Sequence, residues 1–406
     1  MRKLLGDTIQ LKSGAEVKNR LFKSAMSEQL GDKAHNPTKK LHILYGRWAE
    51  GGIGLSVTGN VMVDRNALGE PRNVVLDEIS DLKKFRKWAD QGKKNGAHIW
   101  MQLNHPGKQC PKFLDTEPVA PSAIPLEGGL SKAFNTPRAL EEDEIQAIIK
   151  RFGVSAGLAK KAGFTGVQIH SAHGYLLNQF LSPHHNRRTD EWGGSLENRT
   201  RFVAEIYKAI RASVGDDFPV GIKLNSSDFR DGGFTLEEAI LVAKKLEEEG
   251  IDLIEISGGS YENPSMMGKP GGEKEGYFME YALAIRKAIS IPLVLTGGFR
   301  SGAAMLESLD NGAADMIGLA RPLALEPDFP EQLLKNPDYR ISLPRLSTGI
   351  TGLDKMVMIG LTWYEYQLYV IGKGKKVNPK VSEWKSAFLT FWRLGSHAFS
   401  QRRAKG

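Results

Sequence analysis

The chain has 406 residues, 41% hydrophobic and 25% charged, which is typical of a globular protein with a core large enough for one long domain or two medium ones. Cys110 is the only cysteine. A single cysteine excludes a structural disulfide and, within one chain, any iron–sulfur cluster or zinc site built on several thiolates. The net charge of +8 equals the balance of nine Lys and Arg against one acid over residues 367–406. The preceding body is therefore formally neutral, which argues against a nucleic-acid partner.

The chain begins with MRKLLGDTIQLKSG, which has neither a sustained apolar run nor a small-residue cleavage pattern. No apolar run reaches about 18 residues, the length expected of a membrane-spanning helix. We therefore expect a cytoplasmic protein without an integral membrane segment, and leave open whether it is a homo-oligomer.

Eight apolar segments have the length and composition of buried strands, and amphipathic helical patterns separate them. The expected strands are residues 20–26, 53–59, 97–103, 164–170, 219–225, 252–257, 292–297 and 314–320. The clearest helical patterns are residues 140–163, 196–215 and 235–250. The last of these helices has Thr235 and Glu238 at capping-box spacing. Eight strand–helix units predict an α/β fold, a (β/α)8 TIM barrel, with a doubly wound open sheet as the alternative.

Two segments do not fit the strand–helix alternation. Residues 104–139, after the third strand, are rich in Pro and Gly and longer than a normal connection, so we interpret them as a cover over the active site. Beyond about residue 340 the alternation stops. We expect two domains: a barrel over 1–340 and a basic, aromatic-rich extension over 341–406 that packs on the barrel or on a partner subunit. A membrane-surface role is the alternative for the basic tail, residues 367–406, since cationic amphipathic segments can bind anionic lipid.

The loops after the seventh and eighth strands have the features of a phosphate site. GGFRSG (297–302) follows a strand and opens a helix, and Arg321 follows the eighth strand. In barrels this pair of loops commonly binds phosphate. By contrast, GGIG (51–54) leads from a helix into a strand, the reverse of the dinucleotide-binding order, and is interpreted as a helix end.

The loop after the fourth strand contains His170, His173 and Tyr175 within six residues. Metal binding, a hydrogen-bonded core and a substrate site are all compatible with two imidazoles and a phenol, but no third ligand at a metal-site spacing is evident. The arginines of the following segment, NRRTDEWGGSLENR (186–199), alternate with acids and are interpreted as scaffold ion pairs.

The whole segment from His170 to Phe202 resembles the signature of the Old Yellow Enzyme family of FMN-dependent oxidoreductases. QLNHPGKQ (102–109), KNRLFKSAM (18–26), TGGF (296–299) and LARPL (319–323) resemble further family motifs in order and spacing. The resemblance covers roughly residues 1–340. It implies a flavoprotein that takes NADH or NADPH as co-substrate and acts on a small electrophilic substrate.

The resemblance also implies which residues bind FMN. Gly297, Gly298, Phe299, Ala320 and Arg321 stand at the phosphate positions. Gln102 faces the pyrimidine edge, and Lys223 supplies a cation near flavin N1 and O2, where many relatives have Arg. Ser27 stands near the N5 and O4 edge, where relatives often have Thr or Cys. The other residues assigned to the flavin site are Ala25, Met26, Asn60 and His170.

The same resemblance implies the chemistry of an ene-reductase. His170 and His173 donate hydrogen bonds to the carbonyl oxygen of an α,β-unsaturated substrate, whose β-carbon accepts hydride from flavin N5. Tyr175 protonates the α-carbon.

Three other functions remain open from the sequence. A dihydrouridine synthase-like FMN barrel, which uses a cysteine as acid, is faintly suggested by Cys110 and the basic tail. A metal-dependent barrel hydrolase using the histidine pair and a non-catalytic binding barrel are the other two. A dienoyl-CoA reductase of the iron–sulfur type is excluded by the cysteine count.

Overall fold

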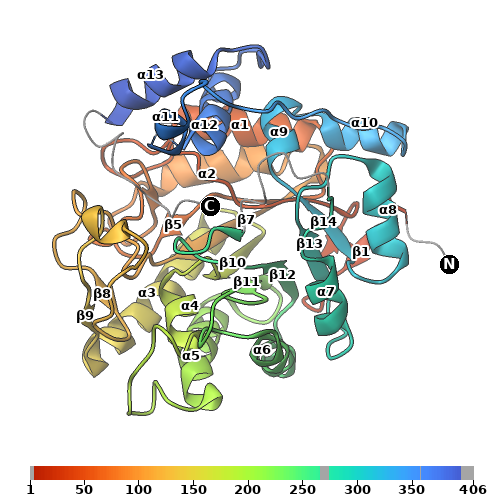
Figure 1. Cartoon of the computed structure of the whole chain (residues 1–406). Helices are drawn as coiled ribbons and strands as arrows, with labels where there is room; N and C mark the ends of the chain where they lie inside the picture. The colour runs from red at the N-terminus through yellow and green to blue at the C-terminus, as the bar shows by residue number, and fades with distance from the viewer. Residues whose placement is uncertain (1–3, 266–273, 357, 395–406) are drawn as a thin grey trace.

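The computed structural model describes residues 4–265, 274–356 and 358–394, and its centre is a closed barrel of eight parallel strands (Figure 1). They are β3 (Leu21–Lys23), β4 (Leu55–Val57), β7 (His98–Asn104), β10 (Gly166–Ser171), β11 (Val220–Asn225), β12 (Leu253–Ser257), β13 (Leu293–Thr296) and β14 (Met316–Leu319). They pair in chain order, and the pairing of β7 with β10 completes the ring. All eight lie within or overlap the predicted strands. The TIM barrel is confirmed, and the open-sheet alternative is wrong.

Helices surround the barrel where the amphipathic patterns predict them. They are α1 (Lys39–Glu50), α2 (Leu82–Gly92), α3 (Glu142–Lys161), α4 (Leu176–Leu181), α5 (Leu196–Val214), α6 (Leu236–Glu249), α7 (Met279–Arg286), α8 (Gly302–Asp310), α9 (Arg321–Leu325) and α10 (Phe329–Lys335). Helices α3, α5 and α6 match the three clearest predicted patterns within two residues at each end.

Local signals set the helix ends. Thr235 caps α6 and forms the predicted capping box with Glu238, and Gly250 ends the helix with a φ of 102°, in the left-handed region that favours glycine. At the end of α1, Gly52 has a φ of 93°. GGIG is therefore a helix end that leads into β4, as the sequence indicates.

The amino end of the barrel is filled by an apolar cluster of its own. Phe22, Leu55, Trp100, Leu253 and Val294 point into the barrel from different strands. The hairpin of β1 (Ile9–Gln10) and β2 (Glu16–Val17) closes this end with its own apolar side chains. Because apolar side chains fill this end, a polar active site within the described barrel can form only at the carboxyl ends of the strands.

The long segment after β7 contains two short strands and a turn of 3-10 helix: β8 (Val119–Ala120), η2 (Leu130–Lys132) and β9 (Arg138–Ala139). β5 (Val61–Met62) and β6 (Val74–Val75) lie beside β7 at the same rim. Leu126, Leu130 and Phe134 of the long segment cluster with Tyr175 and Tyr261. Its apolar residues therefore lie over Tyr175, where a cover is predicted.

The C-terminal extension forms three helices: α11 (Thr351–Met356), α12 (Ile359–Gly372) and α13 (Glu383–Leu394). They group beside α1 and α9 on one side of the barrel (Figure 1), where α12 packs against both of those helices. No described helix has the length and apolar character needed to cross a membrane. The division of the chain into two domains at residue 340 stays a prediction.

Trp363 is the buried tryptophan of α12. Its ring is fully buried, and its indole N–H donates to the carbonyl of Val381 at 3.1 Å. Trp363→Ala is expected to destabilise the fold by about 3–5 kcal/mol through lost burial and the cavity left behind. Trp392→Ala is a matched control, since Trp392 is 77% exposed and its removal is expected to change stability by about 0.5 kcal/mol or less. Thermal melts of the two variants test this difference, and equal melting temperatures would contradict it.

Candidate active site

The carboxyl ends of β10 and β11 bring predicted polar residues to one rim. The parallel register of these strands pairs His170 with Lys223, and both side chains are buried. Because all strands of a parallel barrel end at the same face, His170 and Lys223 lie at one rim although they are far apart in the sequence. His170, His173 and Tyr175 lie together, with the His170 ring centroid 5.0 Å from that of His173 and 4.8 Å from that of Tyr175.

The backbone of the loop defines the protonation of His170. The N–H of Ala172 donates to His170 Nδ1 at 3.3 Å, so this nitrogen is the acceptor of the ring and Nε2 bears the proton. Burial, assisted by the positive charge of Lys223, holds the pKa of His170 well below its usual value. At neutral pH the ring is therefore an uncharged donor through Nε2, which suits a hydrogen bond to a carbonyl oxygen.

His173 is held in an unusual backbone conformation. Its φ is 61°, and its N–H donates to Asn225 Oδ1 at 3.1 Å. The next residue, Gly174, also has a positive φ of 77°, and a Cβ there would lie 2.6 Å from Gln109 Oε1. The turn therefore requires glycine at position 174. His173 Nε2 lies 2.6 Å from Ser257 Oγ, which fixes the orientation of the imidazole.

The phenol of Tyr175 lies between two polar groups. Asn60 Nδ2 donates to Tyr175 Oη at 3.1 Å, and Tyr261 Oη lies 2.9 Å from it. Tyr175 is 4% exposed, and Tyr261, in the loop after β12, is equally buried. Asn60 is one of the residues predicted for the flavin site, whereas no sequence signal identifies Tyr261. The hydrogen bonds orient the hydroxyl of Tyr175 beside His170, as a positioned acid requires.

A buried polar network extends inward from this rim. Lys223 Nζ lies 3.0 Å from Glu255 Oε1, Gln168 Nε2 donates to Glu255 Oε2 at 2.9 Å, and Gln102 Nε2 donates to Gln168 Oε1 at 2.7 Å. Burial acts to raise the pKa of Glu255, but Lys223 and the hydrogen-bond donors together hold it below its usual value. Gln102 Oε1 is buried and accepts no hydrogen bond from any described residue. It is thus an acceptor available to a ligand that carries an N–H.

The turn after β13 is predicted to bind phosphate at the start of the following helix, and the structure places a carboxylate there instead. Gly298 has a φ of 75°, and a Cβ there would meet only Lys274 O at 3.6 Å, so the backbone conformation rather than lack of space favours glycine. The N–H groups of Arg300 and Ser301, at the start of α8, donate to Glu275 Oε2 at 2.6 and 3.0 Å. A carboxylate therefore already occupies the helix N-terminus. A phosphate would have to bind at the preceding glycine turn.

Arg321 begins α9 directly after β14 and is partly buried. Its guanidinium forms no hydrogen bond or ion pair with the described residues. Burial raises the pKa of Tyr364 in α12, and the positive charge of Arg321 opposes this shift. A partly buried guanidinium with unused donors suits a dianionic phosphate. Of the other predicted phosphate-site residues, Gly297 accepts a hydrogen bond from the backbone of Tyr277, Phe299 is buried in the core, and Ala320 precedes α9.

The segment after β3 connects the rim to the C-terminal extension. Ala25 and Met26 pack on the core, whereas Ser27 Oγ donates a hydrogen bond to a carboxylate. Glu70 Oε2 lies 2.7 Å and Glu365 Oε1 lies 2.9 Å from this oxygen. Since Ser27 has one hydroxyl proton, these carboxylates compete with the predicted hydrogen bond to flavin. Glu365 belongs to α12, and no sequence signal links it to Ser27.

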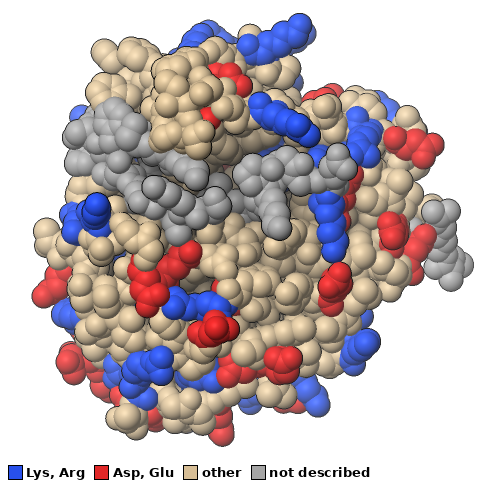
Figure 2. All heavy atoms as spheres, viewed as in Figure 1, with Lys and Arg blue, Asp and Glu red and all other residues tan. Residues whose placement is uncertain are grey.

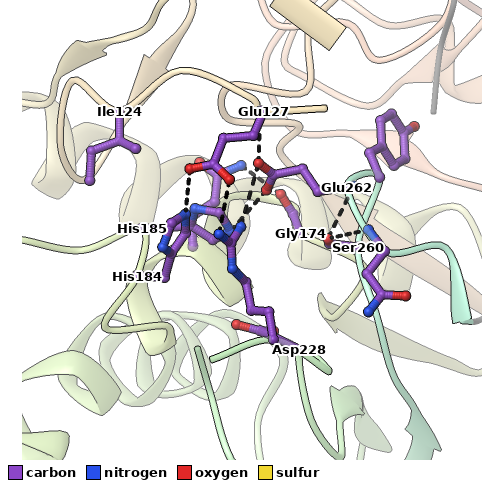
Figure 3. Close-up of polar contacts among 12 residues, drawn as sticks. Ile124, Glu127, Gly174, His184, His185, Asp228, Ser260 and Glu262 are labelled. Atoms are coloured by element: carbon purple, nitrogen blue, oxygen red, sulfur yellow. Dashed lines mark hydrogen bonds and ion pairs between the residues drawn. The ribbon is translucent and has the colours of Figure 1, made fainter. Parts of the chain in front are cut away.

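An ion-pair cluster joins the cover to the loops after β10, β11 and β12. Figure 3 shows the side chains of Glu127, His184, His185 and Glu262 turned toward one another. Glu127 pairs with Arg230 at 3.0 Å, and His185 Nε2 lies 3.4 Å from Glu262 Oε2. In the described part of the chain, Glu127, His184 and Glu262 form the one group of three possible metal ligands. This group excludes His170 and His173, and the guanidinium of Arg230 already pairs with both of its carboxylates.

Cys110 does not have the environment of a reactive thiol. It is 1% exposed, its Sγ donates to Leu68 O at 2.8 Å, and burial raises the pKa of the thiol to about 12. A cysteine acid for a large RNA substrate needs an accessible sulfur. The site thus gives no support to the dihydrouridine synthase alternative.

The fold and the site define a TIM-barrel enzyme. Its buried polar residues and its candidate phosphate-binding loops lie at the carboxyl ends of the strands, where such barrels have their active sites. Residues 5–338 match the model of the NADH:flavin oxidoreductase / NADH oxidase family. The chain therefore belongs to that family, which includes the Old Yellow Enzymes, and it is an NAD(P)H-dependent flavin oxidoreductase.

Individual relatives agree with this assignment. The NADH-dependent flavin oxidoreductase iliE of Hypocrea jecorina (strain QM6a) is 38% identical over 82% of this chain and 90% of its own length. The protein of the same name from Neonectria sp. (strain DH2) is also 38% identical, but this chain spans only 49% of its length. Among solved structures, the Old Yellow Enzyme homologue of Zymomonas mobilis is 28% identical with a TM-score of 0.72, covering 83% of this chain and 94% of its own. Morphinone reductase is 27% identical with a TM-score of 0.72, covering 85% and 92%.

Proposed function

We propose that the protein reduces the activated C=C bond of an α,β-unsaturated carbonyl compound or a similar small electrophile, with FMN as cofactor and NAD(P)H as the source of reducing equivalents. One observation carries this proposal. The Nε2 donor of neutral His170 and the oriented phenol of Tyr175 lie side by side at the rim, with ring centroids 4.8 Å apart. A carbonyl donor next to a proton donor is what reduction of an enone requires.

The described residues fit the chemical groups of FMN. Gln102 Oε1 is an unused buried acceptor for a ring N–H, and Lys223 supplies a buried cation in the same polar network. Gly298 and Arg321 provide an open turn and unused guanidinium donors for a phosphate. Bound FMN supplies hydride chemistry that no protein side chain offers. The protein residues bind the cofactor, orient the substrate and move a proton.

Each residue of the catalytic loop has a separate role in this proposal. His170, and His173 beside it, hold the carbonyl oxygen of the substrate and draw electron density from the alkene. Tyr175 transfers its hydroxyl proton to the substrate α-carbon. Asn60 and Tyr261 position that hydroxyl through their hydrogen bonds.

The direct test is to reduce the purified holoenzyme with NADH or NADPH without oxygen and then mix it with 2-cyclohexenone. Reoxidation of the flavin together with formation of cyclohexanone is expected. Reoxidation by O2 or quinones but by no enone, nitroalkene or nitrate ester would leave the family assignment intact and reject the ene-reductase proposal. Mass spectrometry of the released cofactor tests FMN separately, and FAD in its place would reject that assignment.

Arg321→Ala is expected to weaken FMN retention, because the substitution removes a partly buried cation and its charge-assisted hydrogen bonds to a dianionic phosphate. These bonds contribute roughly 1.5–3 kcal/mol each, so the dissociation constant of FMN should rise by at least about tenfold. Flavin fluorescence after dialysis measures the loss. Lys335→Ala removes a cation that is 68% exposed and serves as the control. Equal retention by both variants would mean that Arg321 does not bind the phosphate.

A further inference from the structure

Helix α13 exposes three large aromatic side chains in one line. Trp384, Phe388 and Trp392 are 52%, 61% and 77% exposed, and their spacing of four residues places them on one face of the helix. Ser386 and Ala387 are buried on its inner face, and α13 packs against α12. The helix is therefore attached to the protein by its small residues, with its largest apolar side chains turned to solvent.

This face is unlike the rest of the described surface. Every Trp and Phe that is exposed among the described residues lies on α13, whereas the other five tryptophans of the chain are at most 2% exposed. Single exposed apolar residues are common, but an aligned set of aromatic rings usually marks a binding surface. The tryptophans lie eight residues apart, at opposite ends of the line.

Positive charge is concentrated in the segment that leads into the same helix. Five lysines between α12 and the first turn of α13 are exposed: Lys373, Lys375, Lys376, Lys380 and Lys385. Residues 367–406 contain nine Lys and Arg against the single acid Glu383, while the preceding body is formally neutral. In Figure 2, blue side chains are visible at the upper edge of the molecule, where Figure 1 places α12 and α13. The apolar line and the charge thus lie on one side of the protein.

We propose that α13 docks the enzyme on an anionic phospholipid surface, lying in the plane of the interface. Trp384, Phe388 and Trp392 would enter the boundary between headgroups and acyl chains, while the lysines contact lipid phosphates. A short helix with aromatic residues on one face and Lys or Arg beside them binds membranes in this way. A second copy of the chain suits the face less well, because two identical cationic surfaces repel each other.

Co-sedimentation of the full-length holoenzyme with vesicles tests the proposal. Binding is expected to vesicles of phosphatidylcholine mixed with phosphatidylserine, to be much weaker with pure phosphatidylcholine, and to fall with added salt. The triple variant Trp384→Ser, Phe388→Ser, Trp392→Ser should bind at least about tenfold more weakly, because it loses most of the apolar area that enters the membrane. Each Lys→Gln change at 373, 375 or 376 should weaken binding by roughly fivefold.

Two controls distinguish binding through α13 from nonspecific adsorption of the protein to vesicles. Ile79→Ser with Leu241→Ser removes exposed apolar side chains elsewhere, 78% and 57% exposed, and should leave vesicle binding unchanged. Trp384→Phe with Trp392→Phe should still sediment, yet lose the quenching of tryptophan emission by brominated lipid, because the five remaining tryptophans are buried.

Three outcomes would overturn the proposal. The first is equal binding to both vesicle types, and the second is no binding to either. The third is a dimer in light scattering that the triple Ser variant abolishes without any effect on vesicle binding, which would assign the face to a second copy. Turnover of the soluble enone by the triple variant is expected to equal that of the parent, which confirms that the variant is folded.

Discussion

Tyr175→Phe is expected to slow enone reduction by roughly 100-fold or more, while reduction of the bound flavin by NAD(P)H proceeds at the parent rate. The substitution keeps the ring that packs under the cover and removes only the hydroxyl held by Asn60 and Tyr261. Transfer of hydride from NAD(P)H to the cofactor needs no proton at the substrate α-carbon, whereas reduction of the enone does. The two half-reactions should therefore respond differently to one missing proton donor.

Stopped-flow absorbance of the flavin measures both steps in separate mixing experiments. Reoxidation by O2 should also stay at the parent rate, which verifies that the variant binds flavin normally. Tyr261→Phe is the matched control, since it removes one hydroxyl bonded to Tyr175 but leaves the acid itself, and a loss of only a few fold is expected. If Tyr175→Phe is reoxidised by 2-cyclohexenone as fast as the parent, the proton comes from another residue or from solvent.

The barrel was predictable from the sequence because its determinants are local. Each of the eight strands is a short apolar run, and helices α3, α5 and α6 have clear amphipathic patterns, with end signals such as Thr235 and Gly250 in α6. The loop after β10 was predictable for the same reason. His170, His173 and Tyr175 lie within six residues, so one strand end and one turn bring them together.

The partners of these residues were not predictable, because they come from distant elements. Tyr261 reaches Tyr175 from the loop after β12, and Glu365 reaches Ser27 from the C-terminal extension, 338 residues along the chain. Glu275 accepts hydrogen bonds from the amides at the start of α8. A phosphate therefore cannot bind those amides as predicted and could bind only at the glycine turn before them. A carboxylate in a loop has no local pattern that reveals which backbone amides it will meet.

In the C-terminal extension, the sequence likewise does not reveal which aromatic side chains are buried. Its aromatic residues are evident in the sequence, and together they suggest packing on the barrel or on a partner. Trp363 is fully buried, whereas Trp392 is 77% exposed. Trp363 lies on α12, which packs against α1 and α9, whereas Trp392 lies on the outer face of α13, which packs against α12. Which of these side chains is buried depends on tertiary packing rather than on hydrophobicity.

Lys223→Met is expected to destabilise the protein by about 3–5 kcal/mol, because it removes the cation from a buried ion pair and leaves Glu255 charged in the barrel interior. Lys223 and Glu255 are 5% and 0% exposed, so water cannot replace the lost partner. Lys335→Met breaks an ion pair whose side chains are 68% and 45% exposed, and a loss of about 1 kcal/mol or less is expected for this control. Urea denaturation of the flavin-loaded proteins measures both changes.

The pH dependence of the Lys223→Met defect identifies its cause. In the parent, the pKa of Glu255 is lowered in the folded state, so this group stabilises the fold above its unfolded pKa and loses that contribution as the pH falls through the acid range. In the variant, burial acts without the opposing cation and raises the pKa of Glu255, so protonation on acidification relieves the buried charge. The difference between the two proteins should therefore be largest near neutral pH and shrink toward acid pH. Glu255→Gln in the Lys223→Met background should recover much of the loss at pH 7, since the amide is uncharged and its oxygen can still accept from Gln168. A defect that is independent of pH and unchanged in the double variant would show that lost packing of the lysine stem, not the uncompensated carboxylate, destabilises the barrel.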